Sequence, residues 1–135
     1  MKKIENYRKC LDVLEKAEFD RASDEEIYRM GVAWQFDRTF ELSWKALQAV
    51  MRLHGVSGAE SGSPRDMLKL GYSNGFISDS EIWLLMLNKR NDSIHIYDEE
   101  KIDELLILIR DSFIPAFEKL ASVLVAKEKD AENGL

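Results

Sequence analysis

The chain has 135 residues, of which 45% are hydrophobic and 33% are charged. This length suits one domain with its own apolar core, and the composition excludes a disordered chain. The 19 Lys and Arg residues against 25 Asp and Glu residues give a net charge of -6. That balance excludes nucleic-acid binding through bulk positive charge but leaves room for a small basic site.

Two helices are predicted in the first half of the chain. Apolar residues recur every three or four positions over residues 2–19, which predicts an amphipathic helix from Lys2 to about Phe19. The run Ser23-Asp24-Glu25-Glu26 has the spacing of a capping box, in which the serine and the last glutamate satisfy each other's free backbone donors. It predicts a long second helix that ends near His54.

Two shorter helices are predicted next. The run Ser63-Pro64-Arg65-Asp66 predicts the start of a short helix that ends at Gly71, because proline is favoured at the first helical position. The run Ser78-Asp79-Ser80-Glu81 has the spacing of another capping box and predicts a helix that continues to about Ile96.

The last predicted helix is long and contains a proline. Asp98 is expected to cap a helix from Glu99 to about Lys127, which Pro115 should bend because it removes one backbone donor. The charged tail, residues 128–135, is expected to fray. Together the elements predict one all-α domain over residues 1–127, an up-and-down four-helix bundle with one additional short helix.

The sequence also restricts the cellular compartment of the protein and the metals or cofactors that it can use. The single cysteine, Cys10, excludes an intrachain disulfide and a cysteine-based zinc site, and we interpret it as a core residue. No apolar run reaches the roughly 18 residues of a membrane span, and the N-terminus lacks the apolar segment of a signal peptide. We expect a cytoplasmic protein that avoids membranes and uses neither a metal nor a cofactor.

The long second helix has an outer face with two interpretations. Charged side chains recur on this face at helical spacing: Arg38, Glu41, Lys45 and Arg52. Apolar residues share its stripe nearer the start of the helix: Ile27, Met30 and Trp34. One interpretation is a solvated face stabilised by the Glu41–Lys45 pair. The other is a contact surface, such as a dimer interface, because a tryptophan lies among the charges.

The stretch from Arg90 to Tyr97 combines residues that suffice for metal-free phosphodiester chemistry. Arg90 can hold a phosphate through two hydrogen bonds and stabilise the charge of the transition state. His95 can transfer a proton near neutral pH, and Asn91 can orient a phosphate or a ribose hydroxyl. The alternative is an ordinary helix C-terminus, where arginine and histidine interact with the helix dipole and Tyr97 packs on a neighbour.

The spacing of Arg90 and His95 restricts how they can act together. On a regular helix the two residues lie about 140° apart around the axis. They converge only through the reach of the arginine, through a distorted helix end, or through the same motif on a second subunit.

Three segments, in this order, carry a family resemblance. The first is FDRTFELSWK at residues 36–45; the second is Ser63-Pro64-Arg65 followed by Gly71 and Ile77; the third is Trp83 followed by Arg90-Asn91-x-x-x-His95-x-Tyr97. Over roughly residues 5–125 the chain resembles the bacterial and archaeal nucleotidyltransferase substrate-binding proteins of the HEPN superfamily. The third segment matches the superfamily's motif of an arginine and a histidine separated by four residues.

The resemblance implies a helical bundle that forms a homodimer and has a minimal nucleotidyltransferase, encoded nearby, as its partner. This chain would then be the subunit that binds the substrate or a nucleotide. We expect three binding residues on the second helix, which are Arg38, Glu41 and Lys45. The fourth is Asn91, which directly follows the motif arginine.

The resemblance also implies an alternative, because HEPN toxins cut RNA without a metal. In that scheme Arg90 and His95 are catalytic: Arg90 holds the scissile phosphate, and His95 activates the ribose 2′-hydroxyl or protonates the leaving oxygen. The nucleotidyltransferase then silences the toxin by adding AMP to Tyr97. The acidic charge favours the binding subunit, whereas the intact Arg90, His95 and Tyr97 favour the ribonuclease. We adopt the binding subunit and keep the ribonuclease as its alternative.

Overall fold

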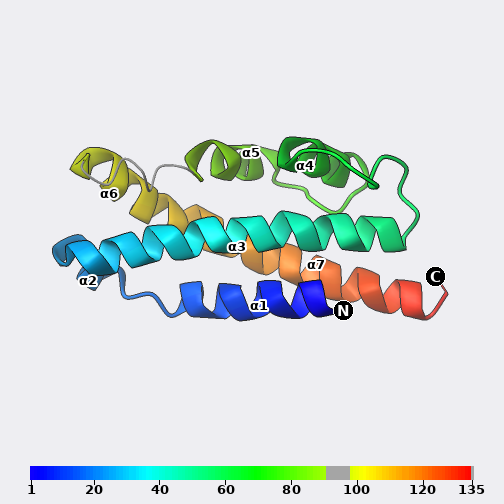
Figure 1. The fold of residues 1–135 in the computed structure, drawn as a ribbon, viewed down its shortest axis with the longest axis horizontal. Helices are drawn as coiled ribbons and strands as arrows, with labels where there is room; N and C mark the ends of the chain where they lie inside the picture. The colour runs from blue at the N-terminus through cyan, green and yellow to red at the C-terminus, as the bar shows by residue number, and fades with distance from the viewer. Residues whose placement is uncertain (91–97, 135) are drawn as a thin grey trace.

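Helix α3 (Glu26–Leu53) runs the length of the molecule, and the other helices pack around it (Figure 1). The computed structural model describes residues 1–90 and 98–134, and all regular structure in those ranges is helical. α1 (Lys2–Glu15) and α2 (Phe19–Asp24) precede α3. The later elements are α4 (Pro64–Ser73), α5 (Ser80–Lys89), α6 (Glu99–Leu108), the π-helical turn η2 (Ile109–Phe113) and α7 (Ile114–Glu132). The all-α prediction is confirmed.

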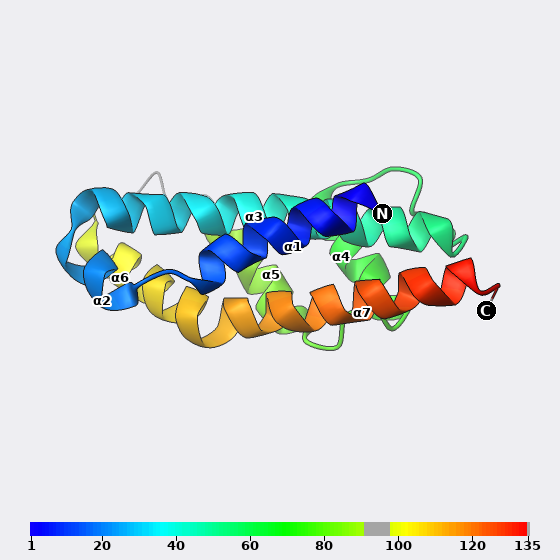
Figure 2. The same ribbon diagram turned by 90° about the horizontal axis from the view of Figure 1, so that it is seen from below.

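Successive legs of the chain run in opposite directions (Figures 1 and 2). α1 is antiparallel to α3, α4 and α5 together form the third leg, and α6, η2 and α7 form the fourth. α1 lies on one side of the α3–α7 pair, and α4 and α5 lie on the other. Both termini lie at the same end, where the amino group of Met1 is 2.8 Å from the Glu128 carboxylate. The predicted bundle is therefore confirmed, with a third leg built from two short helices.

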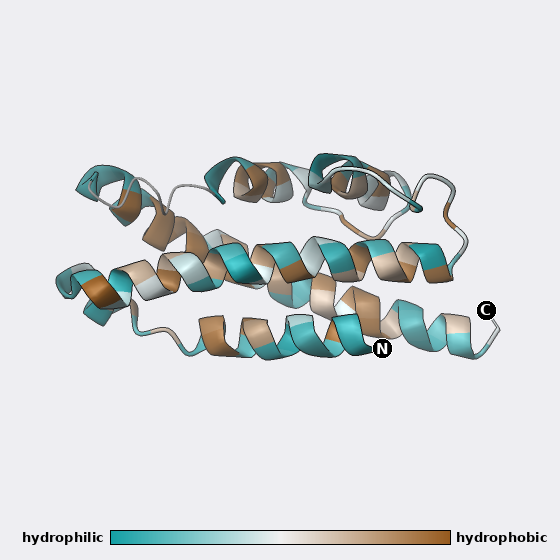
Figure 3. Cartoon of the chain, viewed as in Figure 1, coloured by the Kyte–Doolittle hydropathy of each residue, from teal (hydrophilic) through white to brown (hydrophobic). Residues whose placement is uncertain are grey.

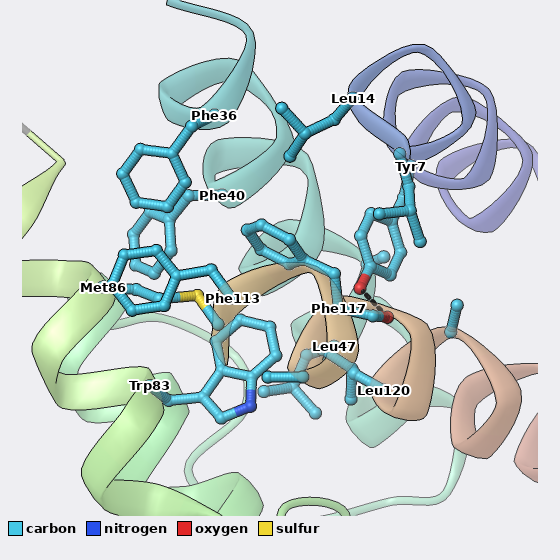
Figure 4. Close-up of a cluster of buried hydrophobic side chains, with 14 of the residues drawn as sticks. Tyr7, Leu14, Phe36, Phe40, Leu47, Trp83, Met86, Phe113, Phe117 and Leu120 are labelled. Atoms are coloured by element: carbon cyan, nitrogen blue, oxygen red, sulfur yellow. Dashed lines mark hydrogen bonds between the residues drawn. The ribbon is translucent and has the colours of Figure 1, made fainter. Parts of the chain in front are cut away.

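The core is aromatic at its centre (Figure 4), and the helices turn their apolar faces towards it (Figure 3). Phe117 of α7 is fully buried, with its ring centroid 6.3 Å from that of Tyr7 in α1 and 5.5 Å from that of Trp83 in α5. Phe36 of α3 lies 6.2 Å away. The Tyr7 hydroxyl donates to the Phe117 carbonyl at 2.5 Å, and burial raises the pKa of Tyr7, so this donor keeps its proton. Cys10 is buried, as expected.

The first connection differs from the prediction. α1 ends at Glu15 rather than near Phe19, and the capping box predicted at residues 23–26 does not form. Ser23 instead lies inside α2, where its hydroxyl donates to the Phe19 carbonyl at 3.2 Å. Inside a helix, a serine hydroxyl can bond to the backbone carbonyl four residues earlier, and it then does not cap a following helix. α3 begins one residue after Glu25, whose backbone is extended.

α4 confirms one predicted cap and corrects one predicted end. Ser63 accepts a hydrogen bond from the backbone of Asp66, whose carboxylate accepts one from the backbone of Ser63, and Pro64 is the first helical residue. The helix does not stop at Gly71 but continues to Ser73. Gly71 has helical backbone and is buried against α3, where an added Cβ would lie 3.0 Å from a methyl carbon of Leu47. Close packing of two helices, rather than a helix end, explains this glycine.

Replacing Gly71 by valine is therefore expected to destabilise the fold by about 2–3 kcal/mol, because the branched side chain overpacks against the fully buried Leu47. The free energy of unfolding is measured by urea denaturation. The control is Gly31→Val on α3, where an added Cβ meets nothing within 4 Å. Equal losses at the two positions would show that β-branching in a helix, and not the approach of α4 to α3, causes the effect.

The caps of the last two legs have opposite outcomes. The capping box predicted at Ser78–Glu81 is wrong: α5 starts after Asp79 without a side-chain cap, and the Ser78 hydroxyl accepts from Lys119 of α7 at 2.6 Å. A partner distant in sequence has replaced the local one. Asp98 does cap α6, accepting from the backbone of Lys101 at 3.3 Å. The predicted extension of the α5 helix to Ile96 lies outside the described residues.

Pro115 follows a local change of helix type. η2 separates α6 from α7, and the chain changes direction there (Figure 1). A π-helical turn shifts the hydrogen-bond register, and the helix can then tolerate the backbone N–H that the proline lacks. α7 continues to Glu132, whereas the sequence predicted a helix end near Lys127.

α1 and α7 also share a pair of exposed carboxyl groups. The side chains of Glu15 and Glu118 are joined by a hydrogen bond. This bond, followed by partial burial and repulsion from Glu118 and Asp12, raises the pKa of Glu15 to about 7. One proton is therefore held between α1 and α7 near neutral pH.

This proton makes the stability of the fold depend on pH. The folded chain binds it more tightly than the unfolded chain, so its contribution is complete below about pH 4.5 and is lost as the pH rises through about 7. We expect Glu15→Gln to flatten the fall in unfolding free energy between about pH 5 and 8, by less than about 1 kcal/mol because solvent screens exposed groups. Glu81→Gln is the control; an identical pH profile for Glu15→Gln and wild type would contradict the assignment.

Candidate functional site

Arg90 lies directly after the last residue of α5 and points towards α3. Its Nη1 atom is 3.6 Å from Oε1 of Glu41, and 32% of its side chain is exposed. The preceding helix α5 is packed against the core, because Trp83 and Met86 are buried and the Trp83 ring lies 6.3 Å from that of Phe40 in α3. The anchored helix end therefore presents the guanidinium at the surface beside α3.

Glu41 is the centre of a charged cluster. The Glu41 cluster consists of Glu41, Trp44, Lys45 and Arg90. Oε2 of Glu41 accepts a hydrogen bond from Nε1 of Trp44 at 3.2 Å and lies 3.8 Å from Nζ of Lys45. Lys45 also approaches the Trp44 ring, 5.9 Å from its centre. Residues three and four positions apart lie on one face of a helix, so α3 by itself presents the three side chains together.

The charges of the Glu41 cluster favour an anionic ligand. Two cations face one carboxylate, which gives a local positive charge in a chain whose net charge is -6. Half of the Lys45 side chain (50%) is exposed, so solutes can reach it. A phosphate can take charge-assisted hydrogen bonds from both cations, and the guanidinium can bind it in a bidentate way. Without a ligand, Glu41 serves as the counter-ion that orients Arg90.

The neighbouring Lys89 is engaged elsewhere. Its Nζ atom lies 3.3 Å from Oε1 of Glu104 in α6, and its side chain is only 18% exposed. The end of α5 is thus tied to α3 through Arg90 and to α6 through Lys89. This double attachment fixes the point at which the chain enters the Arg90–Tyr97 motif.

The structure brings only some of the predicted site residues together. Glu41, Lys45 and Arg90 lie side by side in the Glu41 cluster. The guanidinium of Arg38 lies over the ring of Trp34, 5.5 Å from its centre, and faces α1 instead. Asn91, His95 and Tyr97 lie outside the described residues, so their predicted roles stay predictions.

Trp44 is the member of the Glu41 cluster that was not among the predicted site residues. Its side chain is half-buried and its ring nitrogen is used by Glu41. The spacing of Glu41 and Trp44 was enough to predict this hydrogen bond, because an acceptor and a donor three positions apart on a helix can meet. A tryptophan at the edge of an apolar face often keeps its N–H for a polar partner in this way.

Two further features are absent from the described part of the chain. Within residues 1–90 and 98–134, no group of His, Cys, Asp and Glu side chains is arranged to hold a metal ion. No helix in the same ranges combines the length and the hydropathy that crossing a bilayer requires.

Comparison with protein-family models gives a match to "nucleotidyltransferase substrate binding protein like" over residues 2–126. The match covers almost the whole bundle. The chain belongs to this family. The Glu41 cluster, which joins α3 to the end of α5, falls inside the matched range.

A relative of known structure supports the fold of this family member. It is the protein ttk003001694 from Thermus thermophilus, whose crystal structure superposes with a TM-score of 0.73 at 26% sequence identity. The similarity covers 87% of this chain and 98% of the Thermus chain. The comparison with curated proteins finds no match.

Proposed function

We propose that this chain is the substrate- or nucleotide-binding subunit of a two-component nucleotidyltransferase. The family match is the observation that carries the proposal. A separate minimal nucleotidyltransferase, encoded nearby, would supply the catalysis, and this chain would supply the binding surface.

The Glu41 cluster supports the binding role. Arg90 and Lys45 hold the phosphates of a nucleotide, which replace the Glu41 carboxylate as the partner of Arg90. Asn91 follows Arg90 directly and is assigned to the same ligand. In a homodimer the two copies of the Arg90–His95 motif would face one shared cleft. Membership of the HEPN superfamily and a cytoplasmic location are parts of this proposal.

Two measurements test the binding role. The chain is co-expressed with the nucleotidyltransferase encoded beside it, and a stable complex is expected on size exclusion, together with a homodimer of the chain alone. ATP is then titrated into the isolated chain and into the complex by calorimetry. Absence of a complex, together with absence of nucleotide binding in both samples, would reject the function.

The alternative is a ribonuclease toxin, and the Arg90-x-x-x-x-His95 pattern followed by Tyr97 favours it. Arg90 would hold the scissile phosphate and His95 would move the proton. The chain and its His95→Ala variant are expressed in cells. Growth arrest with RNA cleavage that His95→Ala abolishes would establish the toxin, whereas equal growth would leave the binding subunit.

Control of such a toxin by its partner has a separate readout. Incubation of the chain with the nucleotidyltransferase and ATP should add AMP to Tyr97, with release of pyrophosphate. Mass spectrometry locates the adduct, and Tyr97→Phe is the matched variant. An adduct on another residue, or none, would remove this part of the alternative.

A further inference from the structure

A groove runs between α1 and the first half of α3, away from the Glu41 cluster. It consists of two adjoining hollows of about 500 Å³ and about 340 Å³. Val13 of α1 and Gln35 of α3 line both hollows, which makes them one continuous groove. Gln35 is held in place because its amide donates to the Cys10 carbonyl at 2.9 Å. We call this feature the α1–α3 groove.

Large apolar side chains surround the α1–α3 groove and remain exposed. The exposed fractions are 86% for Ile27, 58% for Trp34 and 57% for Val13, and Met30 lies on the same stripe at 46%. Ile27, Met30 and Trp34 are spaced by three and four residues, so they form one ridge along α3. A contiguous apolar ridge beside a groove is typical of a protein-binding surface.

The charge of the α1–α3 groove limits what binds there. Cations line it, namely Lys9, Lys16 and Arg38, and no acidic residue of the described chain does. Lys16 is paired with Asp12 at 2.9 Å, whereas Arg38 overlies the ring of Trp34. Lys9 and Arg38 therefore line the groove from α1 and α3 without a carboxylate between them. An acidic ligand complements this groove, although the whole chain is itself acidic.

The length of the groove fits a helix. Its lining on α3 extends from Ile27 to Leu42, which corresponds to about 22 Å at 1.5 Å per residue. A helix of about 15 residues covers that length in four turns. Such a helix buries its apolar face in the groove and keeps both edges of that face at the cationic rim.

A second copy of the chain is a poorer occupant. In a two-fold dimer across this groove, each subunit presents the same patch to its partner. Lys9 and Arg38 would then meet the partner's acid-free lining and gain no carboxylate. The cations instead select a different protein.

We propose that the α1–α3 groove binds an amphipathic helix of a partner protein, with acidic side chains along the edges of its apolar face. The helix contacts Trp34 and Val13, and its carboxylates pair with Lys9 and Arg38. The inference goes beyond nucleotide binding and does not depend on it, because it uses neither Arg90, Glu41 nor Lys45.

Two synthetic helical peptides of 15 residues test the groove. Both carry the same leucine face; one has glutamates along its edges and the other has lysines. Binding is followed by NMR through the three indole N–H signals of the protein, which belong to Trp34, Trp44 and Trp83. We expect the glutamate peptide to shift the Trp34 signal and leave the buried Trp83 signal in place, and to bind at least about tenfold more tightly than the lysine peptide.

Variants separate charge from shape. Lys9→Glu should reverse the preference between the peptides, and Trp34→Ala should weaken both by about tenfold. Arg65→Glu, an exposed arginine on α4, is the matched control and should change neither. Equal affinity for the two peptides, or no shift of the Trp34 signal with either, overturns the proposal. A Trp34 shift that follows protein concentration without any peptide also overturns it, because a second copy would then occupy the groove.

Discussion

Replacing Phe117 by alanine is expected to lower the free energy of unfolding by about 3–5 kcal/mol. Its side chain is completely buried and lies between α1, α3 and α5, with ring contacts to Tyr7, Phe36 and Trp83. No other element can fill the space, because all three neighbours are fixed by their own helices. The variant loses both the transfer free energy of the ring and the contacts around the cavity.

Urea denaturation followed by circular dichroism measures this effect. The matched control is Tyr72→Ala on α4, an aromatic side chain that is 54% exposed and should cost less than about 0.5 kcal/mol. Because the hydrogen bond from Tyr7 goes to the backbone carbonyl of Phe117, it survives the substitution. A loss below about 1 kcal/mol at Phe117 would contradict the packing of the three helices around this ring.

Replacing Arg90 by alanine is expected to weaken nucleotide binding by about ten- to one-hundredfold. Loss of a charge-assisted hydrogen bond costs about 1.5–3 kcal/mol, and 1.4 kcal/mol corresponds to a factor of ten. Arg90→Lys should recover part of the affinity, since it keeps the charge but loses the bidentate geometry. Glu41→Gln should strengthen binding about threefold, because it removes the carboxylate that competes with a phosphate for Arg90.

These variants are compared by calorimetry with ATP and by thermal unfolding. Arg65→Ala, at an exposed position in the first turn of α4, is the control for loss of one positive charge. Each substitution should change stability by less than about 1 kcal/mol, because both partners of the Arg90–Glu41 pair are partly exposed. Unchanged affinity in Arg90→Ala, or weaker binding in Glu41→Gln, would show that the Glu41 cluster is not the phosphate site.

The correct and the wrong cap predictions differ in where the partner comes from. Ser63 with Asp66, and Asp98 with Lys101, are satisfied within three residues, so a local pattern is sufficient. The serine at position 78 uses Lys119, which is close only after folding. Gly71 shows the same limit: as a sequence signal it indicates a helix end, but its actual role depends on Leu47 of another helix.

The amino-acid sequence by itself determined the all-α class, the amphipathic faces and the Glu41–Lys45 pair, because helical periodicity and contacts between near neighbours are local properties. It also indicated that residues 90–97 form one motif. Only the tertiary structure decided that Arg90 meets Glu41, that Arg38 turns to Trp34, and that α1 leaves a groove beside α3. The Arg90 contact and the groove join elements distant in the chain, and their positions follow from how the buried faces pack together rather than from the spacing of residues along any one helix.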